Sequence, residues 1–118
     1  MPDIPVIDLQ AVENLRSLNP GDNDEFLREL VGIYLEDTPQ RIAELDSSLA
    51  AADTQTFVRA AHSIKGSSAN LGAAALRSVA EKLETQARTA GLGSVTELVA
   101  QVKAEFARTQ QEFAKLLP

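Results

Sequence analysis

The chain has 118 residues, enough for one domain with a single hydrophobic core. Apolar residues make up 44% of it, aromatic residues only 4%, and cysteine is absent. This composition favours helices and excludes a disulfide scaffold or a zinc finger. A net charge of −6 argues against binding to nucleic acid. No apolar run approaches the roughly 20 residues of a membrane span, and residues 1–5 do not resemble a signal peptide, so we expect a cytoplasmic protein without membrane contact.

The first elements in chain order are an extended leader and a short helix. Residues 1–7 contain two prolines, which block helix formation, so this segment is expected to be extended. Asp8 is a plausible N-cap for a short helix over about residues 8–18. The sequence Asn-Pro-Gly at 19–21 predicts a turn after this helix.

A long amphipathic segment follows the turn. Asp22 and Glu25 have the spacing of a capping box, with Asp in place of Ser or Thr. An apolar stripe in helical phase then runs through Leu27, Val31, Tyr34, Thr38, Ile42, Leu45 and Leu49. Because the phase survives Pro39, we predict one helix over about 23–51 that is bent or loosened at the proline. Two helices separated by a break are the alternative.

The rest of the chain divides into three more amphipathic segments, over about residues 54–71, 73–90 and 94–117. Gly72 is a natural helix-end residue, and Ser-Val-Thr-Glu at 94–97 has the spacing of a capping box. Four long helices with short connections predict an all-α fold, an antiparallel up-down-up-down four-helix bundle whose one end is covered by the short first helix. We expect a single-domain monomer, because every apolar stripe is used within one bundle.

His62 is the only histidine in the chain. At roughly 100° per residue, it lies about 140° from the centre of the apolar stripe of its helix. The residues within about 60° of it are Gln55, Val58, Lys65, Gly66 and Ala69. A lone histidine is most often a partly buried or an indifferent surface residue, but the phase argues against burial. The imidazole is therefore expected to face solvent.

Gly66 indicates that the surface around His62 has a function. Glycine in a helix interior costs about 1 kcal/mol relative to alanine, and here it lies one turn beyond His62, where a missing side chain leaves room for another surface. From spacing alone, Lys65 is best interpreted as an ordinary solvated lysine. The Ser68 hydroxyl, on the core side, is expected to bond back to a carbonyl one turn earlier.

The segment at 62–72, HSIKGSSANLG, resembles the signature of histidine-containing phosphotransfer (HPt) domains. Their pattern is His-x-x-Lys-Gly-Ser, followed by small residues and Leu-Gly. Ala-Ala at 60–61, Leu-Glu at 83–84 and the segment at 26–39 are also typical of this family. The resemblance covers about residues 8–117.

The resemblance implies a phosphocarrier in a two-component phosphorelay. His62 would accept a phosphoryl group from the phosphoaspartate of a receiver domain and pass it to another receiver aspartate. Lys65 would stabilise the phosphoryl oxygens, and Gly66 would let the partner approach. The implied partners are response-regulator receiver domains, hybrid sensor histidine kinases, or both. Catalysis and Mg²⁺ would come from the partner, so the chain would be neither an enzyme nor the holder of a cofactor.

Several neighbours of His62 are candidate receiver contacts. Those on its own helix are Gln55, Val58, Arg59, Gly66 and Ala69. Glu84 and Arg88 on the next helix could flank the same face, with Glu84 accepting from Nδ1 of His62. The alternative for Glu84 and Arg88 is a surface ion pair at i,i+4 spacing. Nε2 is the expected phosphorylated atom, because it lies further from the backbone.

The residues argue against a bundle hydrolase or a metal site. A di-metal carboxylate bundle requires Glu-x-x-His pairs, but Arg59 stands three residues before the only histidine. No phosphate-binding loop is present either. An adaptor that binds receiver domains without carrying phosphate stays open as an alternative. The sequence also leaves open whether the chain is free-standing or a domain of a hybrid kinase.

Overall fold

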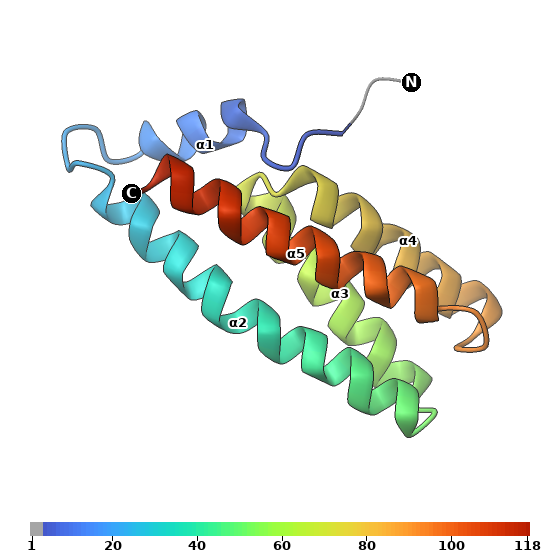
Figure 1. The fold of residues 1–118 in the computed structure, drawn as a ribbon. Helices are drawn as coiled ribbons and strands as arrows, with labels where there is room; N and C mark the ends of the chain where they lie inside the picture. The colour runs from blue at the N-terminus through green and yellow to red at the C-terminus, as the bar shows by residue number, and fades with distance from the viewer. Residues whose placement is uncertain (1–3) are drawn as a thin grey trace.

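The computed structural model describes residues 4–118, and this part of the chain contains five helices (Figure 1). Their bounds are α1 Leu9–Arg16, α2 Glu25–Ala50, α3 Thr54–Leu71, α4 Ala74–Ala90 and α5 Thr96–Leu116. Residues 4–8 precede the first helix. Residues 1–3 lie outside the described part, and so does that portion of the predicted extended leader.

Helices α2 to α5 run alternately up and down and form a four-helix bundle, which confirms the predicted fold class (Figure 1). Each helix packs against the next, and α5 returns to α2. The side chains most deeply buried between them include Leu27, Leu45, Phe57, Ile64, Leu76, Leu83, Val102 and Phe113. Within residues 4–118, no helix is long and apolar enough to cross a membrane.

α2 is one helix that continues through Pro39, so the alternative of two helices with a break is wrong. Proline removes one backbone donor from the helix. The preceding residue, Thr38, is buried, and its Oγ1 donates to the carbonyl oxygen of Tyr34 at 2.7 Å. Burial of Tyr34 on one side of the proline and of Leu45 on the other holds the helix together across the missing bond.

Both predicted capping boxes are wrong. α2 has Asp24 as its N-cap, in the left-handed conformation, while the carboxylate of Asp22 accepts from the backbone N–H of Phe26 at 3.1 Å. At the start of α5, no side chain among the described residues caps the helix. Ser94 Oγ instead accepts a hydrogen bond from Gln86 Nε2 at 2.8 Å. In both places the spacing was right, but the loop enters the helix in another conformation.

α1 covers the end of the bundle where α3 turns into α4. Its N-cap is Asp8, whose carboxylate accepts from the backbone N–H of Gln10 at 3.0 Å, as predicted. The backbone N–H of Asp8 donates to the carbonyl oxygen of Gly72 at 2.7 Å. Gly72 has φ +77°, and a Cβ there would lie 2.9 Å from Cβ of Ala11. Glycine is therefore required both to end α3 and to seat α1.

A buried hydrogen bond joins α2 to α3. The hydroxyls of Tyr34 and Ser68 lie 2.8 Å apart, and both side chains are buried. The prediction that Ser68 bonds back to its own helix is thus wrong, and Ser67 makes such a bond instead, to the carbonyl oxygen of Ser63 at 3.0 Å. Burial raises the pKa of Tyr34 to about 12 although the bond to Ser68 opposes this change.

Candidate functional site

His62 lies in the middle of α3, and its side chain is 61% exposed. α3 begins at its N-cap Asp53, whose carboxylate accepts from the backbone N–H of Thr56 at 3.2 Å. Phe57 and Ile64 on the other side of the helix are buried in the core. Their burial fixes the rotation of α3 and turns the imidazole outward, as the helical phase predicts.

Glu84 of α4 connects the imidazole to two cations. Its Oε2 lies 2.9 Å from Nδ1 of His62 and accepts from Nη2 of Arg88 at 2.8 Å. Its Oε1 lies 2.7 Å from Nζ of Lys65. Three positively charged or proton-donating groups from α3 and α4 therefore converge on one carboxylate.

This carboxylate is buried and remains charged. Only 5% of Glu84 is exposed, although His62 and Arg88 beside it are well exposed. Burial opposes ionisation of Glu84, but hydrogen bonds from Lys65, Arg88 and His62 outweigh it and lower its pKa to about 2. Glu84 is consequently ionised at neutral pH.

The ionised carboxylate determines which imidazole nitrogen carries the proton. A carboxylate only accepts hydrogen bonds, so Nδ1 of His62 donates its N–H to Glu84. In the neutral imidazole the lone pair is then on Nε2. Among residues 4–118, Nε2 has no hydrogen-bond partner. The ring thus presents a nucleophilic nitrogen to the solvent.

The surface around His62 is open. Gly66, one turn further along α3, is exposed, and a Cβ at this position would meet no atom within 4 Å. Nothing within the described chain therefore requires glycine here. Ala69, another turn on, is also exposed, so the surface beyond the imidazole is shallow.

A hollow of about 580 Å³ lies beside the imidazole, between α3 and α4. Its lining residues are Thr54, Gln55, Val58, Arg59, His62, Ala87 and Arg88. The structure therefore brings the candidate contacts Gln55, Val58, Arg59 and Arg88 together with His62. Gly66 and Ala69 continue the same helix beyond the hollow.

The structure revises the interpretation of two candidates. Lys65 is not an ordinary solvated lysine, because its side chain is only 27% exposed and pairs with Glu84. The pair of Glu84 and Arg88 exists at i,i+4 spacing, but Glu84 is buried rather than on the surface. Sequence reasoning missed the contact of Lys65 with Glu84, and it missed Thr54 and Ala87 in the hollow. The contact had a signal, since a lysine three residues after His62 lies on the same side of α3.

A family model described as "Hpt domain" matches residues 29–112. The chain belongs to the Hpt domain family. Like other members of the family, this Hpt domain is a phosphocarrier in phosphorelays rather than an enzyme in its own right.

One curated relative of this Hpt domain is Multistep phosphorelay regulator 1 of Schizosaccharomyces pombe. The two are 33% identical over 82 residues, which is 70% of this chain. The matched region is only 28% of that protein's length, so the relative has a large part without a counterpart here.

Solved structures resemble this Hpt domain over nearly its whole length. Histidine-containing phosphotransfer protein B (HptB) from Pseudomonas aeruginosa PAO1 matches with a TM-score of 0.85 and 31% identity, over 94% of this chain and 93% of that one. The phosphotransfer protein MtHPt2 from Medicago truncatula matches with a TM-score of 0.83 over 94% of this chain and 76% of that one. Its identity of 19% indicates a shared fold alone.

Proposed function

We propose that Nε2 of His62 accepts a phosphoryl group from the phosphoaspartate of a receiver domain and passes it to the aspartate of another. The observation that carries this proposal is the contact of an exposed imidazole with a buried, ionised carboxylate, Glu84. The contact leaves the lone pair on the nitrogen that faces solvent. The same ring would serve both halves of the relay, because the transfer is reversible.

The transfer exchanges one bond to phosphorus for another. The lone pair of Nε2 attacks phosphorus, the bond from phosphorus to the aspartyl oxygen breaks, and the aspartate leaves as a carboxylate. No proton has to move, since Nδ1 of His62 keeps its N–H on Glu84. In the second transfer, a receiver carboxylate attacks phosphorus and the electron pair of the P–N bond returns to Nε2. Such a step requires positioning and charge neutralisation more than covalent machinery.

Two cations support the proposed role. Lys65 Nζ and Arg88 Nη2 are held on Glu84 at 2.7 and 2.8 Å, next to the imidazole. A phosphoryl group on Nε2 adds negative charge beside them. We expect Lys65, and then Arg88, to direct part of their interaction to the phosphoryl oxygens, which favours the loaded state.

The partners and the metal are part of the same proposal. We propose response-regulator receiver domains and hybrid sensor kinases as partners, for a monomeric chain in the cytoplasm. Residues 4–118 contain no group of three or more His, Asp or Glu side chains that could hold a metal ion. We propose that the Mg²⁺ used in transfer is bound by the carboxylates of the receiver domain.

The test is a transfer profile against a panel of receiver domains carrying labelled phosphoaspartate. Wild type should acquire a label that is acid-labile and base-stable. Since the chain has one histidine, His62→Gln should abolish the label. Ser63→Ala, which removes the neighbouring hydroxyl, is the control and should be labelled like wild type.

Two outcomes would contradict the proposal. A label that persists on the His62→Gln variant would place the acceptor elsewhere. A wild-type chain that binds receiver domains but never acquires a label would be an adaptor.

A further inference from the structure

The charge of the chain is divided unevenly among its helices. α3 contains Arg59 and Lys65 and has no acidic residue. α3 and α4 together carry five basic and two acidic residues, a net charge of +3. All other residues carry six basic and fifteen acidic ones, a net charge of −9. The imidazole thus lies on a positively charged pair of helices in a chain whose net charge is −6.

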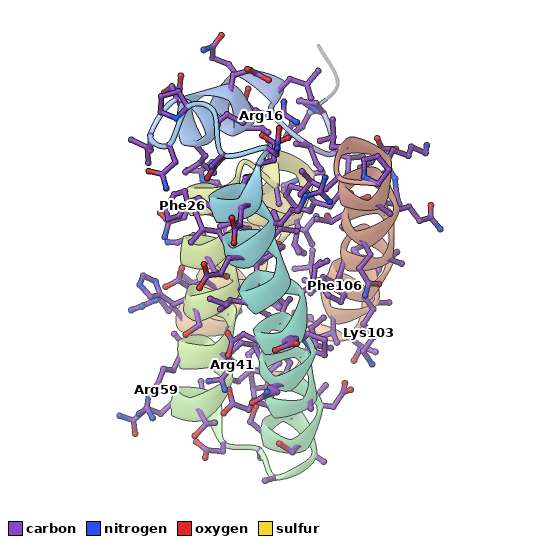
Figure 2. The ribbon with its side chains drawn as sticks, turned by 90° about the vertical axis from the view of Figure 1, so that its left-hand side faces the viewer. Arg16, Phe26, Arg41, Arg59, Lys103 and Phe106 are labelled. Atoms are coloured by element: carbon purple, nitrogen blue, oxygen red, sulfur yellow. The ribbon has the colours of Figure 1, made fainter. Side chains whose placement is uncertain are left out.

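The positive charge reaches the surface around the hollow. Arg59 is exposed, points outward from α3 in Figure 2, and forms no salt bridge with another residue in 4–118. Arg88 on the other side of the hollow leaves 59% of its side chain exposed while it binds Glu84. Glu84 is itself buried and also neutralised by Lys65. An approaching molecule therefore meets cations on both sides of His62.

The opposite sign prevails on α2. This helix carries six acidic and two basic residues. Five of the acidic ones are exposed: Glu25, Glu29, Glu36, Asp37 and Asp46. The molecule thus has one positive and one negative side, and this polarity can orient a charged partner before contact.

Screening determines whether the local or the total charge dominates. At physiological salt the screening length is about 8 Å. The molecule measures 48 × 32 × 20 Å, so a partner near α3 and α4 senses mainly the charge of this face. An acidic partner is therefore attracted here, although the net charge of the whole chain would repel it.

We propose that the face formed by α3 and α4 selects protein partners whose docking surface is acidic, with Arg59 and Arg88 as the cations that steer them onto His62. This inference rests on the proposed function for the identity of the partner as a receiver domain, whose carboxylates would supply the acidic surface. The inference adds that charge affects the rate at which the two proteins meet, and not only how well they fit after contact. Steering of this kind raises association rates by about 10- to 1000-fold at low salt.

The charge distribution can be tested without any partner. An anionic and a cationic nitroxide of the same size are added in turn, and the paramagnetic relaxation of each backbone amide is measured by NMR. At low salt, the amides of His62 and Gly66 should relax at least about twofold faster with the anionic probe, and those of Glu29 and Glu36 with the cationic one. The contrast should vanish at high salt. An equal or opposite preference at His62 would overturn the proposal.

The steering itself is tested with a receiver domain that labels His62. Arg59→Glu should lower the association rate by about 10-fold at low salt and flatten its salt dependence. The matched control is Arg108→Glu, the same charge change at an exposed position of α5, which should alter the rate less than about twofold. Circular dichroism verifies that both variants fold.

The two proposals fail in different ways. If His62 is labelled but Arg59→Glu and Arg108→Glu associate equally fast, steering by this face is wrong and the carrier function stands. If no label reaches His62, the carrier function fails, while the nitroxide measurement still decides whether the face is positive.

Discussion

Nδ1 of His62 and Oε2 of Glu84 lie 2.9 Å apart and join an exposed side chain of α3 to a buried one of α4. The carboxylate accepts the proton of Nδ1, so the free lone pair is on Nε2. The same carboxylate holds Lys65 and Arg88. One residue thus orients the imidazole, fixes its tautomer and positions two cations beside it.

Replacing this carboxylate should slow phosphotransfer. Glu84→Gln keeps the shape of the side chain but removes the charge that binds His62, Lys65 and Arg88. We expect loading of His62 to fall by about 10-fold or more, because the imidazole loses the acceptor that fixes its tautomer and orientation. Nitrogen NMR of the imidazole should show that the population with Nδ1–H decreases. The control is Glu81→Gln, which replaces an exposed acid one turn earlier on α4. It should change neither the loading of His62 nor the population with Nδ1–H.

Because of Glu84, the free energy of unfolding should also depend on pH. Its pKa falls from 4.5 to about 2 because three hydrogen bonds favour the carboxylate over the effect of burial. The resulting stabilisation is fully present above about pH 5 and is lost as the pH falls through 4.5 towards 2, since the unfolded chain binds the proton first. The difference in free energy of unfolding between wild type and Glu84→Gln should shrink over this range in urea titrations. A difference independent of pH would contradict the assignment.

Gly66 should be needed for docking and not for folding. Gly66→Gln adds a neutral side chain that meets no atom of the chain within 4 Å at Cβ and raises helix propensity, so the fold should be kept or slightly stabilised. Transfer from a receiver domain should nevertheless fall by about 10-fold or more, because the partner cannot approach. Gly32→Gln is the control, at another exposed interior glycine, on α2. Equal transfer by the two variants would show that Gly66 is merely a tolerated irregularity.

The bond between Tyr34 and Ser68 should appear as coupling in a double-mutant cycle. Tyr34→Phe and Ser68→Ala each leave one buried hydroxyl without its partner, which costs about 1–2 kcal/mol. The double variant removes both hydroxyls, so we expect it to lose clearly less stability than the sum of the two single changes. Urea unfolding measures all four proteins. Additive losses would mean that the two hydroxyls do not depend on each other.

Local patterns in the sequence predicted the features that depend on one helix alone. The phase of α3 predicted the exposure of His62, and the residue types at Asp8 and Gly72 predicted a cap and a helix end. The burial of Glu84 could not be predicted from the sequence of its own helix. It lies at the edge of the apolar stripe of α4, where burial depends on how α3 packs across it.

The errors have the same origin. Ser68 was predicted to bond within its own helix. Its actual partner, Tyr34, lies on α2, and the sequence of one helix does not show the register in which it packs against another. A glycine in a helix interior is also not a specific sign of a docking surface, because Gly32 has the same open surroundings as Gly66. What distinguishes Gly66 is the exposed imidazole one turn away.

The most direct test of the carrier function is to locate the phosphoryl group on the protein itself. The chain has a single histidine, so nitrogen-15 labelling of histidine gives the resonances of one ring. After loading from a phosphorylated receiver domain, the account predicts phosphorus coupling to Nε2 of His62, with Nδ1 still protonated and bonded to Glu84. Phosphorus on Nδ1, or on any residue other than His62, would contradict it.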